Sequence, residues 1–118
     1  MDNRRPRLKG KQLTSAISAA IAELYRDFYG HDRATATTYI NDNIVVCVLE
    51  DILTTRESVL VAHGGRREVI DERVAFQEGT EDEFTAAIER LTRRRVVAFL
   101  SANQTEPGVA CELFFLES

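Results

Sequence analysis

The feature that most constrains the fold is a pair of stretches that are apolar at odd and even positions alike. Residues 44–49 read IVVCVL, and residues 109–116 read VACELFFL. Side chains of a β-strand point alternately to opposite faces of the sheet, and an antiparallel sheet with one face in water normally alternates apolar and polar residues. Because these stretches do not alternate, we expect both faces of the sheet to be covered.

Two arrangements would cover both faces. The helical segments can divide between the faces, or they can all pack on one face while the other meets a second copy of the chain or another protein. Paired sheet faces in small domains commonly form twofold-symmetric dimers, so we expect a homodimer. Cys111, Leu113 and Phe115, at odd positions of the final stretch, are then candidate interaction residues.

The first half of the chain predicts a helix followed by a β-hairpin. Apolar residues recur at spacings of three and four across residues 11–29, which is typical of an amphipathic helix. Gly30 follows where a left-handed helix cap suits glycine. Residues 35–40 favour a strand, Asn41–Asn43 favours a turn, and 44–49 favours the second strand.

Next, a helix is predicted to begin at about residue 55. Thr54 and Glu57 have the T-x-x-E spacing of a capping box, in which each side chain bonds a backbone N–H of the other residue. Gly64 and Gly65 would each cost a helix about 1 kcal/mol relative to alanine. We therefore expect a break or bend there, before a second helical piece that reaches Phe76.

The last third predicts one more helix and a second hairpin. Thr80 and Glu83 repeat the capping-box spacing directly after Gly79, so a further helix is expected from there to about Arg93. A strand over 96–100, a turn built from Asn103, Thr105, Glu106, Pro107 and Gly108, and the final apolar stretch follow.

The element order is therefore α-ββ-α-α-ββ. This order indicates an α+β fold, with a four-stranded antiparallel sheet made of two hairpins and helices packed on it. At 118 residues the chain has the size of one domain. We place that domain at residues 12–118.

Charge divides the chain into a basic arm and an acidic body. Residues 1–11 carry five Lys or Arg against one acidic residue, which leaves residues 12–118 with a net charge of −8. Such an arm can hold phosphates, an acidic surface or a membrane leaflet, but short charged termini are commonly disordered. We expect residues 1–11 to be disordered.

Composition favours a cytoplasmic protein, free or peripheral to the membrane. The arm lacks the apolar core of a signal peptide, and nowhere does the chain reach the roughly 18 apolar residues of a membrane-spanning helix. Cys47 and Cys111 lie in apolar stretches without metal-ligand spacing. We expect them to be buried, reduced thiols.

No pattern in the sequence favours enzymatic chemistry. His31 and His63 lack a nucleophile or a second ligand at useful spacing, and the chain has no phosphate-binding glycine loop. The carboxylates between Asp71 and Glu83 are explained better by a solvated helix face than by a cation site. We expect no enzyme activity, catalytic residue, metal or cofactor.

Glu112 is the charged residue inside the final apolar stretch. An unpaired buried carboxylate would cost several kcal/mol, so Glu112 should meet an arginine, lie at an edge or face a partner. Asp71, Arg73 and Glu50 are further candidates for such pairs.

Five segments, in order along the chain, resemble the MpsC-like family. They are LYRDFYG (24–30), IVVCVLEDILTTRE (44–57), GRREVIDERVAFQE (65–78), IERLTRRRVVAFLS (88–101) and EPGVACELFFLE (106–117). The family is named for a component of a Na⁺-translocating membrane-potential-generating system. The resemblance implies a non-catalytic accessory or regulatory protein that works with an integral membrane transporter subunit, in a system linked to cation movement and inorganic carbon supply.

The resemblance supplies no catalytic residues, but it draws attention to one charged helix. Its candidate interaction residues are Arg67, Glu68, Asp71, Glu72 and Arg73. The chain departs from the family pattern in two places, because Leu91–Arg94 stands for L-T-G-R and Pro107–Gly108 stands for P-D. The first departure removes a glycine that would favour the left-handed end of a helix.

Two other functions stay open at this point. A regulatory nucleic-acid-binding protein would use the basic arm and Arg93–Arg95, although the acidic body and the lack of a recognisable nucleic-acid motif count against it. A small-ligand sensor would use a pocket between helices and sheet.

Overall fold

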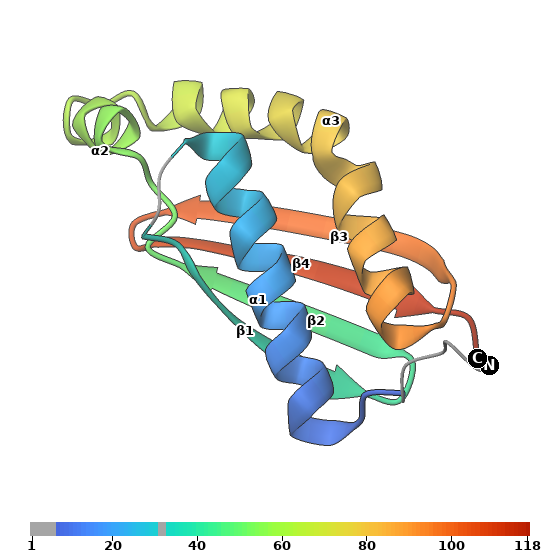
Figure 1. Cartoon of the computed structure of the whole chain (residues 1–118). Helices are drawn as coiled ribbons and strands as arrows, with labels where there is room; N and C mark the ends of the chain where they lie inside the picture. Colours follow the sequence, from blue (N-terminus) through green and yellow to red (C-terminus); the bar gives the residue numbers. More distant parts are fainter. Residues whose placement is uncertain (1–6, 31–32) are drawn as a thin grey trace.

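Helices α1 and α3 pack on one face of a single antiparallel sheet, as Figure 1 shows. The computed structural model describes residues 7–30 and 33–118. Its elements are α1 (Gly10–Tyr29), β1 (Thr35–Asn41), β2 (Ile44–Glu50), α2 (Thr55–Ala62), α3 (Arg66–Thr92), β3 (Val96–Thr105) and β4 (Gly108–Leu116). The predicted α+β fold and its order α-ββ-α-α-ββ are confirmed.

The strands form one sheet in the order β1-β2-β4-β3. Each pair is antiparallel, and the two predicted hairpins are joined through β2 and β4 at the centre of the sheet. The register places Val46 opposite both Tyr39 of β1 and Leu113 of β4, and Leu113 opposite Leu100 of β3. Side chains in such a row share one face of the sheet.

The core lies between the sheet and the two long helices. Alternate residues of the central strands point into the core, and α1 and α3 cover it on the side opposite the sheet. Its fully buried members include Ile17, Ile21 and Tyr25 of α1, Val45, Cys47 and Leu49 of β2, Ile88 of α3 and Phe114 of β4.

Helix α1 follows the predicted pattern closely. Ile17 and Ile21 are buried, one helical turn apart, because the period of 3.6 residues returns them to one face. Gly30 ends the helix in the left-handed conformation, with φ at 68°, and its N–H donates to the carbonyl of Arg26. The glycine cap is confirmed.

Helix α2 lies beyond the end of the sheet, beside the start of α3 (Figure 1). Thr54 and Glu57 form the predicted capping box, with N···O distances of 2.9 and 3.1 Å. Gly64, with φ at 84°, and Gly65 separate α2 from α3. The predicted break at the two glycines is confirmed.

The second predicted break, at Gly79, is wrong. Helix α3 runs without interruption from Arg66 to Thr92, and Thr80 is a buried residue inside it rather than a cap. Buried positions at Val69, Arg73, Thr80 and Phe84 continue one helix face across the glycine. Packing of that face against α1 and the sheet outweighs the modest helix propensity cost of one glycine.

Strand β3 is also longer than predicted. Asn103 and Thr105, which were expected in the turn, pair with Ala110 and Gly108 of β4 and extend the ladder to the end of the hairpin. The turn itself shrinks to Glu106 and Pro107. Paired backbone groups in a long hairpin satisfy hydrogen bonds that a wide loop would leave to water.

The distribution of the helices resolves the question of the two sheet faces. Both α1 and α3 lie on the same face, and none of the helices in the described part of the chain covers the other (Figure 1). Residues 1–6 of the predicted arm and His31 lie outside the described residues. No helix in residues 7–30 and 33–118 has both the length and the apolar character that crossing a membrane requires.

Candidate functional site

The uncovered side of the sheet is an apolar surface, which we call the open face. Its central row consists of Tyr39, Val46, Leu113 and Leu100, one from each strand. The rows on either side add Thr37, Val48, Cys111 and Ala102, and Asn41, Ile44, Phe115 and Ala98. Tyr39 and Leu100 are 60% and 59% exposed, so large apolar side chains meet solvent at both margins.

The predicted residues Cys111, Leu113 and Phe115 all lie on the open face, in consecutive rows of the central strand β4. Each is partly exposed, so Cys111 is less buried than expected, whereas Cys47 on the helix side is fully buried. Both cysteines are free thiols. Burial and the nearby Glu112 raise the pKa of Cys111, which keeps it protonated at neutral pH.

The predicted charged residues of α3 divide into two groups. Arg67, Glu68, Asp71 and Glu72 are exposed, and the Glu72 carboxylate pairs with Arg56 of α2 across N···O distances of 3.1 and 3.2 Å. By contrast, Arg73 is only 1% exposed and points into the protein. The structure therefore places Arg73 apart from the other four.

Arg73 is the centre of a buried polar cluster that joins four parts of the fold. Its Nε donates to Glu57 Oε2 at 2.8 Å, and its Nη2 donates to Glu57 Oε1 and to the Ile52 carbonyl, both at 2.7 Å. Nη1 donates to the Tyr25 hydroxyl of α1 and, at 3.5 Å, to Asn103 Oδ1 of β3. We call this the arginine cluster.

Aromatic rings enclose the guanidinium from the α1 side. Its central carbon lies 4.2 Å from the ring centroid of Tyr29 and 5.5 Å from that of Tyr25. Both distances suit a cation–π interaction. Burial raises the pKa of both phenols, partly offset by Arg73, so they stay protonated and the Tyr25 hydroxyl accepts from the arginine.

The ion pair keeps both of its members charged. Burial acts to raise the pKa of Glu57, but hydrogen bonds from Arg73 and from the Thr54 N–H outweigh it and lower the pKa overall. Burial similarly acts to lower the pKa of Arg73, and the hydrogen bonds to Glu57 outweigh that effect. Through its five hydrogen-bond acceptors, the buried Arg73 links α1, α2 and β3 to its own helix, α3.

Glu112 also lies on the helix-facing side, 2% exposed. Its Oε2 has no hydrogen-bond partner among the described residues, and neither has the Oγ of Ser101, its register partner on β3. Burial raises the pKa of Glu112 to about 7, although the positive charge of Arg73 acts to lower it. The expected arginine is therefore near Glu112 but is paired with Glu57.

Sequence reasoning missed the pairing of Glu57 with Arg73. Glu57 was identified only as a helix cap, and its carboxylate does both jobs, since Oε1 also accepts from the Thr54 N–H. One signal was available. Arg73 stands four residues after the apolar Val69, on the core face of its helix, where a charged residue needs a buried partner.

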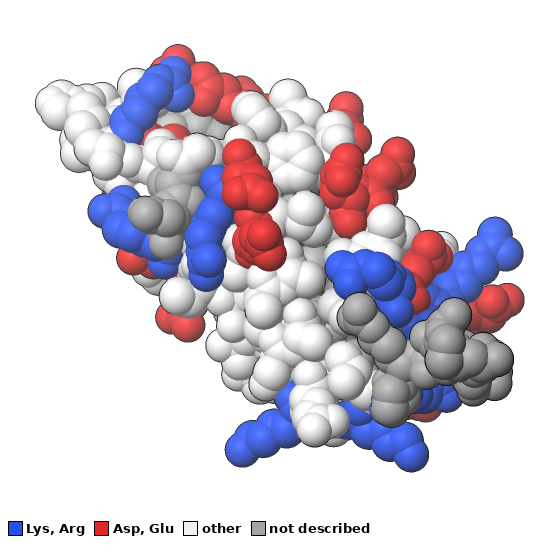
Figure 2. Space-filling model, viewed as in Figure 1, with Lys and Arg blue, Asp and Glu red and all other residues white. Residues whose placement is uncertain are grey.

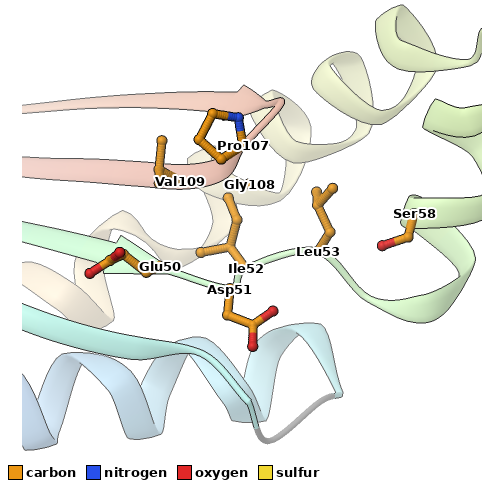
Figure 3. A pocket seen from close by; sticks show the side chains of 8 residues that line it. All are labelled: Glu50, Asp51, Ile52, Leu53, Ser58, Pro107, Gly108 and Val109. Carbon is orange, nitrogen blue, oxygen red and sulfur yellow. The ribbon is translucent and has the colours of Figure 1, made fainter.

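One surface cavity of about 380 Å³ lies where the end of β2 meets the β3–β4 turn (Figure 3). The carboxylates of Glu50 and Asp51 point in different directions there and do not converge on a common point. Across residues 7–30 and 33–118, no group of three or more His, Cys, Asp and Glu side chains could hold a metal ion.

A smaller cavity of about 200 Å³ lies between α1, α2 and α3, whereas the ligand-sensor pocket was predicted between helices and sheet. Its charged lining consists of the Arg56–Glu72 and Arg73–Glu57 pairs, whose hydrogen bonds are already made within the protein. A third hollow of about 410 Å³ runs between α1 and α3, with Glu23, Asp27 and Glu83 beside Arg90.

The predicted nucleic-acid surface lies partly outside the described residues, because residues 1–6 of the basic arm are not described. Figure 2 shows acidic side chains over α1 and α3, with basic side chains mainly toward the two ends of the molecule. Arg94 donates to the carbonyls of Glu117 and Asp42, so it links the segment after β4 to the turn between β1 and β2. Arg93 ends α3 in the left-handed conformation, with φ at 57°. Nucleic-acid binding stays a prediction.

Comparisons with known proteins place the chain in one family. No curated protein and no solved structure matches it. A family model described as "Na+-translocating membrane potential-generating system (MpsC)" matches residues 9–118, which is nearly the whole chain. This protein therefore belongs to the MpsC family.

Proposed function

We propose that this chain is a non-catalytic accessory or regulatory subunit of a Na⁺-translocating, membrane-potential-generating assembly. It works at the cytoplasmic side of the membrane as a homodimer joined through the open face, and it contacts the integral membrane subunits of the assembly. The family to which the chain belongs supports this kind of system. The single observation that supports a binding role is the apolar open face.

The size of the open face supports a protein interface. Four strands spaced about 4.8 Å apart, with about seven residues each at 3.3 Å per residue, make a face of roughly 400 Å². Exposed apolar patches of a few hundred Å² on soluble domains commonly mark interaction sites. Stable dimers bury about 800 Å² per partner, so a dimer through this face should dissociate on dilution.

The composition of the open face favours a second copy as the occupant. The three central rows contain no charged residue, and charge depletion is typical of interface cores. A flat sheet face can pack on its own copy about a twofold axis, with each row facing the same set of side chains. Tyr39 at the margin adds an aromatic contact of the kind enriched in such interfaces.

The buried polar groups of the arginine cluster support a non-catalytic role, because they are hydrogen-bonded to one another. The buried donors of Arg73 are all directed at acceptors of the protein itself, and Glu57 is held by Arg73 and Thr54. Groups that are committed in this way hold elements together and are not available to a substrate.

Light scattering on the wild-type chain, Phe115→Glu and Val74→Glu tests the dimer. Phe115 lies on the open face, and Val74 is a 50% exposed residue of α3 away from it. The wild type and Val74→Glu should have twice the monomer mass at high concentration and fall toward it on dilution. Phe115→Glu should stay folded and monomeric, because two carboxylates would be buried in the interface. A wild type that is monomeric at every concentration would refute the homodimer.

The role in the assembly needs a separate measurement. The integral subunits of a Na⁺-translocating system would be expressed in cells with and without this chain, and the Na⁺-dependent membrane potential recorded. We expect the potential to fall without the chain and to return with the wild type. An unchanged potential, or activity of the purified chain alone on a substrate, would contradict the accessory role.

A further inference from the structure

Glu112 and Arg73 are both buried and the charge of Arg73 acts on Glu112, yet Arg73 is bonded to a different carboxylate, that of Glu57. Glu112 lies on the helix-facing side of β4, opposite Cys47 of β2 and Ser101 of β3. Its Oε2 lacks a hydrogen-bond partner within the described residues. Arg73 already reaches the sheet at Asn103, two residues along β3 from Ser101. Asn103 and Ser101 share one face of β3, so Arg73 contacts the sheet on the face where Glu112 lies.

Arg73 is the positive group that acts on Glu112, and the other groups that face it are neutral at physiological pH. Burial raises the pKa of the Cys47 thiol to about 12 and also raises those of Tyr25 and Tyr29. These groups come from β2 and α1, Ser101 supplies a hydroxyl from β3, and Arg73 itself comes from α3. Among the described residues, Arg73 is therefore the cation with which an ionised Glu112 could pair.

Helix α2 depends on the same arginine. Glu57 is the buried residue of α2, whereas Leu60 and Val61 are partly buried and Val59 is 53% exposed, so no apolar side chain of α2 is fully buried. Its other link to α3 is the solvent-exposed pair of Arg56 and Glu72. Exposed pairs of this kind contribute little. The attachment of α2 is therefore concentrated in the contact between Glu57 and Arg73.

We propose that Glu57 and Glu112 compete for Arg73, and that proton loss from Glu112 loosens α2. With Glu112 protonated, both Glu57 oxygens hold the guanidinium and α2 is fastened to α3. With Glu112 ionised, the guanidinium shifts toward β4 and shares its charge between the two carboxylates. Part of the wall of the 200 Å³ cavity then moves, because Thr54, Arg56 and Glu57 form its α2 side.

The titration of the two carboxylates suits this exchange. The pKa of Glu112 is about 7, while Glu57 has a lowered pKa and stays ionised throughout the neutral range. A change from pH 6 to pH 8 therefore adds one negative charge to the core and no positive charge. The position of α2 becomes sensitive to pH near neutrality, whichever partner the open face meets.

Amide hydrogen exchange measured by NMR at pH 6 and pH 8 tests the proposal. Protection factors, corrected for the intrinsic effect of pH, would be compared for α2 amides 58–62 and α1 amides 17–25. In the wild type and in Glu50→Gln, an exposed-carboxylate control, the α1 amides should lose about tenfold protection at pH 8, because ionisation of Glu112 also destabilises the whole fold by the equivalent of about one pKa unit. The α2 amides should lose at least about tenfold more protection than the α1 amides.

In Glu112→Gln, which resembles the protonated acid, α2 should keep its pH 6 protection at pH 8. An equal loss in Glu112→Gln, an equal loss in α1 and α2, or no loss in the wild type would each overturn the proposal. Glu57→Gln gives an independent check should Glu112→Gln not fold. Its α2 amides should be weakly protected at both pH values, and wild-type protection of α2 at pH 6 in this variant would overturn the proposal too.

Discussion

Arg73 and Glu57 form a buried bidentate ion pair, with N···O distances of 2.7 and 2.8 Å, although they belong to different helices. The pair is 1% and 7% exposed at its two side chains. Neither residue could be inside the protein without the other, because an isolated buried charge is far more costly than a satisfied pair. The contact therefore fixes where α2 lies relative to α3.

Removal of Arg73 should strongly destabilise the fold. Arg73→Met leaves the Glu57 carboxylate buried without its main donor, and breaking a buried pair in this way costs about 3–5 kcal/mol of unfolding free energy. Arg56→Met, which breaks only the exposed pair with Glu72, should cost much less. Urea denaturation of the two variants measures both. Equal losses of unfolding free energy in the two variants would contradict a larger contribution from the buried pair than from the exposed pair.

Stability should fall as pH rises from about 4.5 to 7. Burial raises the folded pKa of Glu112 from 4.5 to about 7, so in this window the unfolded chain loses its proton first and becomes favoured. The full effect is about 3 kcal/mol, at about 1.4 kcal/mol per pKa unit. Glu57, with a lowered pKa, acts in the opposite direction and only below its ordinary range.

Urea denaturation between pH 5 and pH 8 measures this dependence. Glu112→Gln should match the wild type near pH 5, exceed it at pH 8, and show a flatter profile. Glu50→Gln changes an exposed carboxylate and should keep the wild-type profile. A wild type with constant stability over this range would contradict the raised pKa of Glu112.

Arg93→Gly should be more stable than Arg93→Ala. Arg93 has φ at 57° as the cap of α3, a conformation that costs an L-residue roughly 1 kcal/mol and glycine almost nothing. Both substitutions remove the same side chain with its contacts, and only alanine keeps the strained backbone. We expect a difference of about 1 kcal/mol between the two variants in urea unfolding. Equal stability of the two would contradict a strained cap.

Two glycine-to-alanine substitutions should have opposite signs. At Gly79, inside α3, an added Cβ meets no atom within 4 Å, so alanine should gain about 1 kcal/mol from its higher helix propensity. At Gly65 the added Cβ would lie 2.9 Å from the Leu60 carbonyl oxygen and should destabilise the protein. Thermal melting of both variants compares them. A loss at Gly79 would mean that α3 is bent there.

Local signals in the sequence predicted most elements and failed where packing decided between equal signals. Thr54–Glu57 and Thr80–Glu83 have the same capping-box spacing, yet only the first begins a helix. Thr80 falls on the buried face that continues from Val69, so the helix passes through it. A four-residue pattern carries no information about which residues lie opposite it.

The candidate site was predictable in part for the same reason. Strand alternation alone put Cys111, Leu113 and Phe115 on one face, and that is where they lie. The expectation that Arg73 belongs with the exposed Arg67 and Asp71 came from their nearness in sequence. A helix separates such neighbours by about 100° per residue, and Arg73 turns inward.

By itself, the sequence determined the order of the elements, the glycine break between α2 and α3 and the apolar character of both sheet faces. These follow from periodicity and backbone preferences, which act over a few residues. Only the tertiary structure decided that α1 and α3 share one face, that Glu57 holds Arg73 and that Glu112 is buried. Such choices depend on contacts between residues far apart in the chain, where shape and desolvation are settled by all the elements together.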